Sequence, residues 1–124
     1  MRRWWLTIVA PAMLAAAAAA GCATVPPAVP VVTPDGVRFT VVDPQASSVA
    51  LAGSFNQWSV SAHPLTRGRS AGAWSVVVPL PPGEYLFMYV VNGTQWISPP
   101  LAEDYVDDGF GAKNGVVVVR PGER

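Results

Sequence analysis

Residues 74–93, WSVVVPLPPGEYLFMYVVNG, encode two strands and the turns that follow them. From Trp74 to Pro79, apolar side chains recur at every second position, which is typical of a half-buried β-strand. Pro81-Pro82-Gly83 predicts a tight turn. The run from Glu84 to Val91 is apolar on both faces and predicts a longer strand. Asn92-Gly93 then predicts a hairpin turn, because both residues tolerate positive φ.

Short strands and turns continue on both sides of this stretch. We expect further strands at residues 37–41, 48–53, 65–67, 94–97 and 116–120. Turn residues interrupt the chain about every 8 to 12 positions and valine is frequent, as in β-sandwiches. We therefore predict an all-β fold, an immunoglobulin-like β-sandwich of about seven strands. It occupies residues 36–121 and begins after the turn at Asp35-Gly36.

The composition excludes several classes of protein. The chain has 124 residues, of which eight are basic, eight are acidic and 51% are hydrophobic. This length suits a single domain, and the hydrophobic share is too high for a disordered chain. The balanced charge provides no basic face for nucleic acid. The only cysteine, Cys22, excludes a disulfide framework, and His63 has no Cys or His partner for a metal site. We expect neither a metal nor a cofactor.

The N-terminus has the features of a secretory signal. Arg2 and Arg3 precede an uncharged apolar run of 17 residues, from Trp4 to Ala20, which is short for a membrane span. At its end, Ala19-Ala20-Gly21-Cys22 resembles a bacterial lipobox. The resemblance implies a lipoprotein signal peptide over residues 1–21 and lipidation of Cys22. An ordinary signal peptide with an incidental cysteine is the alternative.

The segment between Cys22 and the sandwich predicts a linker over residues 22–35. Its prolines stand among small residues and valines, which is typical of an extended spacer that reaches about 3 Å per residue. A lipidated Cys22 would tie this linker to a membrane of the bacterial cell envelope. In a Gram-negative cell, Ala23 after the cysteine resembles the default for outer-membrane sorting, which implies a domain that faces the periplasm.

A motif at residues 53–58 carries a family resemblance. Gly53-Ser54-Phe55-Asn56-Gln57-Trp58 resembles the GxFNxW motif of carbohydrate-binding module family 48. Further family features follow in order at residues 74–75, 80–85, 92–93, 96 and 109–115. The family includes the glycogen-binding domain of the AMP-activated protein kinase β subunit and the early-set N-terminal domains of isoamylases and branching enzymes. The resemblance spans residues 37–119 and implies the same early-set sandwich.

This resemblance implies binding of an α-1,4-glucan such as glycogen, starch or maltodextrin. The two ligand-facing tryptophans of the family match Trp58 and Trp96, whose indole rings can stack on the apolar faces of pyranose rings. Packing in the core is the alternative for each of them. It is also the interpretation for Trp74, which alternates with Val76 and Val78.

The remaining family positions are only partly retained. Phe110 matches an apolar contact to the glucan, and Asn114 matches an amide that bonds sugar hydroxyls. Met88 stands where the family has a sugar-contacting lysine, and Ala112 stands in place of a threonine. We also expect the amide of Asn56, close to Trp58, to contact sugar, and Met88 to line the same site. The resemblance thus implies an aromatic platform with a reduced polar rim.

Two functions from different classes fit these residues. The first is a non-catalytic lipoprotein that binds α-glucan, or positions a glucan-active enzyme, at the membrane. The second is an envelope protein–protein interaction module, which the apolar Met88 and Ala112 favour. We expect no enzyme, because a small sandwich has little room for the cleft that paired catalytic carboxylates need. A solvated loop is therefore predicted for the acidic residues Glu103, Asp104, Asp107 and Asp108.

Overall fold

The computed structural model describes residues 28–122 of the chain. The expected signal peptide, Cys22 and the first part of the expected linker lie outside this range. The described residues form nine strands in two antiparallel sheets, which confirms the predicted all-β, immunoglobulin-like sandwich. Within residues 28–122 there is no helix of the length and apolarity needed to cross a membrane.

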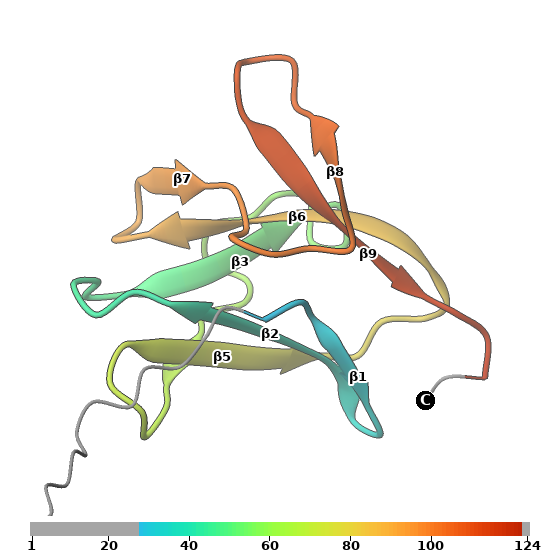
Figure 1. Ribbon diagram of the computed structural model, residues 1–124, viewed down its shortest axis with the longest axis horizontal. Helices are drawn as coiled ribbons and strands as arrows, with labels where there is room; N and C mark the ends of the chain where they lie inside the picture. Colours follow the sequence, from blue (N-terminus) through green and yellow to red (C-terminus); the bar gives the residue numbers. More distant parts are fainter. Residues whose placement is uncertain (1–27, 123–124) are drawn as a thin grey trace, which may run out of the picture.

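The lower sheet in Figure 1 contains four strands in the order β1-β2-β5-β4. Its strands are β1 (Val31–Thr33), β2 (Gly36–Val42), β5 (Ala73–Val78) and β4 (Thr66–Arg67). The pairing of β2 with β5 sets Phe39 opposite Val76 and Val41 opposite Trp74. The alternating residues that predicted these strands therefore face the second sheet together.

The upper sheet contains five strands in the order β3-β6-β9-β8, with β7 added at the end of β6. Its strands are β3 (Val49–Gly53), β6 (Gly83–Val91), β9 (Lys113–Val119), β8 (Asp104–Asp107) and β7 (Gln95–Ile97). The long strand β6 pairs with β3, β7 and β9, so it is the centre of this sheet.

The core lies between the sheets and is rich in aromatic rings. The ring centroids of Phe39 and Phe87 are 5.0 Å apart in an edge-to-face arrangement. Trp74 is buried, as predicted, and its Nε1 donates a hydrogen bond to the Asp43 carbonyl at 3.1 Å. Burial raises the pKa of the Tyr89 phenol, which stays protonated and donates to the backbone of the lower sheet.

Two strands differ from the sequence prediction. Strand β1 lies within residues 22–35, which we expected to be linker, and pairs with β2 alone. Pro30 and Pro34 flank it without entering it, and an edge strand tolerates such neighbours. Strand β8 lies within the acidic segment that we expected to be a loop, and it pairs with β9 alone. Exposed charges suit an edge strand because they oppose pairing with other chains.

The outer face of the upper sheet is also largely covered. Ala50, Ala52 and Val90 form a second buried cluster there, separate from the core, and Trp58 packs against it. Met88 lies opposite Ala52 in the pairing of β6 with β3 and is buried on the same face. Strand β6 is apolar on both faces because one face packs into the core and the other face packs into this second cluster.

We predict that Gly115→Ala destabilises the fold. Gly115 lies in β9 beneath the segment after β7, and an added Cβ would stand 2.6 Å from the Pro99 ring and 3.0 Å from the Phe87 ring. Overpacking of this kind costs about 1–3 kcal/mol. Urea denaturation measures the loss. The control is Gly68→Ala, whose Cβ would meet nothing closer than 3.6 Å. Equal stability of the two variants would contradict the prediction.

Candidate functional site

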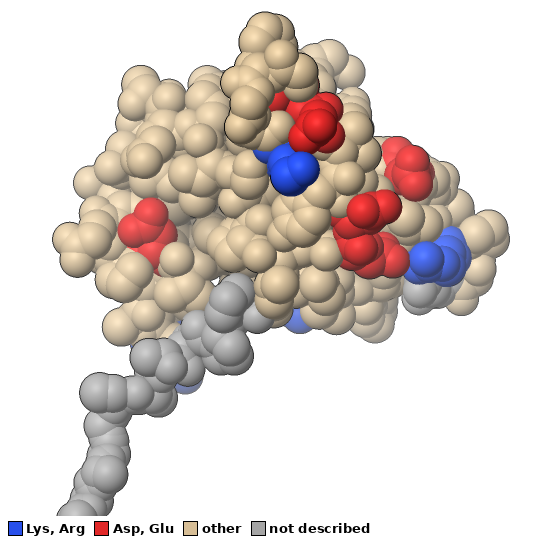
Figure 2. Space-filling view, turned by 45° about the horizontal axis from the view of Figure 1, so that its top comes forward, with Lys and Arg blue, Asp and Glu red and all other residues tan. Residues whose placement is uncertain are grey.

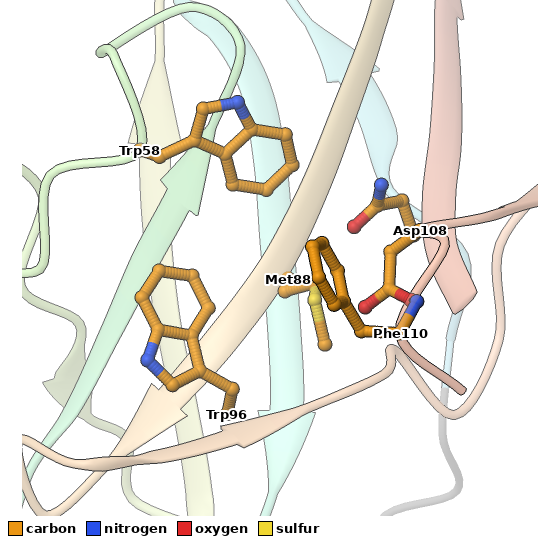
Figure 3. Close-up of a pocket in the computed structure, with 6 residues that line it drawn as sticks. Trp58, Met88, Trp96, Asp108 and Phe110 are labelled. Atoms are coloured by element: carbon orange, nitrogen blue, oxygen red, sulfur yellow. The ribbon is translucent and has the colours of Figure 1, made fainter. Parts of the chain in front are cut away.

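An open hollow of about 510 Å³ lies on the outer face of the upper sheet. We call it the aromatic hollow, and Figure 3 shows its lining. The lining residues are Trp58, Met88, Trp96, Asp108, Phe110 and Asn114. Five of these six residues are candidates that the sequence identified. They come from the loop after β3, from β6 and β7, and from the hairpin of β8 and β9.

Trp58 and Trp96 form one side of the aromatic hollow. Their ring centroids are 6.5 Å apart and the ring planes are inclined by 42°. Trp96 lies opposite Val90 in the pairing of β7 with β6 and is 43% exposed. Trp58 is half-buried on the Ala50 cluster, and neither tryptophan belongs to the core between the sheets. Both rings therefore remain accessible to a ligand.

The residues of the GSFNQW motif build the loop that holds Trp58. Gly53 permits a close approach, because an added Cβ would lie 2.5 Å from both the Leu86 carbonyl oxygen and the Phe55 ring. Phe55 packs against Phe39 of the core, with ring centroids 5.9 Å apart. The loop is thus fixed to the sandwich at its first and third residues.

Asn56 holds the loop from inside. It is only 7% exposed, and its Oδ1 accepts hydrogen bonds from the backbone of Gly53 at 3.0 Å and Ser59 at 3.2 Å. Its Nδ2 donates to the Leu51 carbonyl at 3.0 Å and lies 2.8 Å from His63 Nδ1, which accepts because an amide NH₂ can only donate. This corrects the expectation that Asn56 contacts sugar, since its amide is fully engaged within the protein.

The backbone at the end of this loop is strained. Gln57 and Trp58 have φ values of 57° and 58°, in the left-handed region that residues with side chains rarely adopt. Such a conformation costs of order 1–3 kcal/mol per residue and persists only where the surroundings enforce it. Here the Trp58 amide donates to the Gly53 carbonyl at 2.9 Å, and the Asn56 bonds close the same turn. The strain serves to place the Trp58 ring on the outer face of the sheet.

The hairpin of β8 and β9 forms the opposite side of the aromatic hollow. Phe110 lies at its tip and is 93% exposed. Asp108 Oδ1 accepts hydrogen bonds from the backbone of Phe110 at 2.7 Å and Ala112 at 3.1 Å. Gly109 and Gly111 flank the phenylalanine at φ values of 86° and 96°, which glycine adopts without strain. Sequence reasoning missed Asp108 as a site residue, although the Asp-Gly dipeptide before Phe110 is a turn signal.

The floor of the aromatic hollow is apolar, and one residue of the lining carries a charge. Met88 is buried beneath the rings, and half-buried Asn114 contributes an amide. Among the described residues of the lining, Asp108 alone carries a charged side chain. Its neighbour Asp107 forms an exposed ion pair with Lys113 at 3.2 Å. Figure 2 shows that acidic side chains lie at several separate places on one face of the molecule. Residues 28–122 contain no group of three side chains suited to hold a metal ion.

This lining suits a ligand with apolar faces and hydroxyl edges. Flat aromatic rings provide large rigid contact areas for the faces. The amide of Asn114 and the carboxylate of Asp108 can form hydrogen bonds with hydroxyl groups. These are the chemical properties of pyranose rings.

A comparison with protein families matches residues 27–102 to the model described as carbohydrate-binding module 48 (isoamylase N-terminal domain). The chain is also similar to 1,4-alpha-glucan branching enzymes GlgB. For the enzyme from Pseudomonas syringae pv. syringae (strain B728a), the identity is 42% over 66 residues, which are 52% of this chain and 9% of the enzyme. For GlgB 1 from Xanthomonas campestris pv. campestris (strain 8004), it is 38% over 72 residues, 57% of this chain and 10% of the enzyme. The matched part thus spans about a tenth of these relatives.

We predict that Asn56→Ala destabilises the protein and displaces Trp58. The variant leaves the Gly53 amide and the Leu51 carbonyl buried without their partner, and each such group costs about 1–3 kcal/mol. Urea denaturation gives the stability, and indole fluorescence reports the surroundings of the tryptophans. Gln57→Ala is the matched control, because Gln57 is exposed in the same loop. If both variants lose the same stability, Asn56 is not what holds the loop.

Proposed function

The chain belongs to carbohydrate-binding module family 48, and we propose that it is a non-catalytic module that binds α-1,4-glucan in the aromatic hollow. The ligand class comprises glycogen, starch and maltodextrin. The observation that carries this proposal is the pair of indole rings, 6.5 Å apart and inclined by 42°. The named substrate of the similar branching enzymes, 1,4-alpha-glucan, supports it.

The inclination of the two rings favours a curved glucan. In an α-1,4-linked chain, successive pyranose rings turn relative to one another and the chain curves. Stacking requires each indole plane to lie parallel to the sugar face that it contacts. Two rings inclined to each other therefore suit neighbouring faces of a curved chain better than those of a flat ribbon. Phe110, on the opposite side of the hollow, adds an apolar contact to the same turn of glucan.

The lining supports binding rather than hydrolysis. Glycosidases generally use two carboxyl groups, placed about 5–10 Å apart across the bond that is cleaved. Among the residues that line the aromatic hollow, Asp108 is the only carboxylate. We therefore propose a module without catalytic activity, which holds glucan or positions a glucan-active enzyme beside it.

We also propose that a lipid on Cys22 displays the module at the cell envelope. The support is the lipobox resemblance of Ala19-Ala20-Gly21-Cys22 and the basic, apolar segment before it. The lipid chains would provide stable membrane attachment. The proposed location is the outer membrane, with the module facing the periplasm.

Loss of the indole rings is expected to abolish glucan binding. The protein should migrate more slowly in a native gel that contains glycogen or amylose. Trp58→Ala and Trp96→Ala should each weaken binding about tenfold, because tryptophans in such sites contribute a large share of the affinity. The double variant should migrate as it does without polysaccharide. Val77→Ala is the control, since Val77 is 38% exposed and lies on the lower sheet, outside the aromatic hollow.

Two results would refute the proposal. One is that the unmodified protein migrates as fast as the double variant in gels that contain glycogen or amylose. The other is release of reducing ends from either polysaccharide by the purified protein, which would indicate catalysis.

The lipid anchor has a separate test. Bacteria that express the protein and grow with labelled palmitate should incorporate the label, and Cys22→Ser should abolish incorporation because the thiol that carries the lipid is lost. The Cys22→Ser protein should also leave the membrane fraction. Equal labelling of both proteins would show that Cys22 is not the lipidated residue.

A further inference from the structure

Asp108 takes part in two different features of the aromatic hollow. Its Oδ1 accepts two backbone hydrogen bonds, from Phe110 and Ala112, and so fixes the tip of the hairpin. Among the described residues, no hydrogen bond reaches its Oδ2. The side chain is half-buried and lines the hollow. One carboxylate oxygen therefore holds the protein, and the other is available to a ligand.

The charge of Asp108 is not neutralised by an ion pair within residues 28–122. The nearest cation in the hairpin, Lys113, is paired with Asp107, and Arg120 is paired with Glu103 at 3.3 Å. The other lining residues are uncharged. The lining that the structure describes therefore carries a single negative charge, that of Asp108.

Such a charge favours neutral ligands over anionic ones. A carboxylate oxygen accepts strong hydrogen bonds from sugar hydroxyls. The same oxygen repels a phosphate or carboxylate group on the ligand, and like charges placed together are a general means of rejecting wrong partners. Among the described residues that line the hollow there is no cation to offset this repulsion, and Lys113 of the same hairpin is paired with Asp107.

We propose that Asp108 makes the aromatic hollow selective for neutral α-glucan against glucan that carries phosphate groups. This inference rests on the proposed function and deepens it, because it names the residue that sets the charge preference. The same residue positions Phe110, so one carboxylate controls both the shape and the charge of the hairpin side of the site.

The test compares amylose with phosphorylated amylose of the same length, at low salt and neutral pH. We expect the unmodified protein to bind the neutral polymer at least about fivefold more tightly. Salt at about 0.5 M should reduce this preference to less than about twofold, because it screens the charge. A preference with a purely steric cause would not respond to salt.

Three variants separate the two roles of Asp108. Asp108→Asn keeps an oxygen that can accept the hairpin bonds but removes the charge. Amylose binding should weaken less than in Asp108→Ala, and the preference for amylose over phosphorylated amylose should fall to about twofold or less. Asp108→Ala removes the bonds to the hairpin as well as the charge, so amylose should bind about tenfold more weakly and the preference for amylose over phosphorylated amylose should be lost. The control Asp104→Asn makes the same change in net charge outside the lining and should keep the preference.

The outcomes are decisive in each direction. A preference that Asp108→Asn removes and Asp104→Asn keeps supports the proposal. Equal binding of the two polymers by the unmodified protein overturns it, and so does a preference that Asp108→Asn leaves unchanged. In both of these cases amylose binding persists and only this inference fails. If the unmodified protein does not bind amylose, the proposed function fails with it.

Discussion

The side-chain amide of Asn56 is bonded at both ends, and the position of Trp58 depends on it. It bonds to Gly53 and Leu51 of β3 before the turn and to Ser59 and His63 after it, so one buried side chain joins both sides of the turn. This arrangement offsets the left-handed backbone of Gln57 and Trp58, which would otherwise relax. The amide thus acts together with the Trp58–Gly53 backbone bond and the packing on Ala50 and Ala52 to set the position of the Trp58 ring.

A platform on a sheet also needs room above the strands. Alanines at positions 50 and 52 of β3 leave space for the Trp58 ring, and they are buried because the ring covers them. Met88 and Val90 of β6 continue this apolar floor toward Trp96. Both faces of the upper sheet therefore contact apolar groups, although only one face belongs to the core of the sandwich.

The sequence predicted the central strands well because their side chains alternate or are apolar throughout, as in Trp74–Val78 and Phe87–Val91. It did not predict β1 and β8, which are edge strands. Each pairs only with the next strand in the chain, and their short, proline-flanked or acidic sequences reflect exposure more than pairing. The same limit applies to single side chains. The sequence shows that Asn56 and Asp108 are polar, but only the fold shows that one amide is used internally and one carboxylate faces the hollow.

The two sides of the aromatic hollow are held in place by different interactions. The tryptophan side rests on the sheet and on a buried amide, so changing it disturbs the fold. The hairpin side rests on Asp108 and two glycines with open space around them, so it can change without repacking. The family match covers Trp58, Met88 and Trp96 and ends at residue 102, before the hairpin residues of the lining. A fixed stacking platform with a separately built rim allows the rim to alter ligand choice while the platform continues to provide most of the contact area.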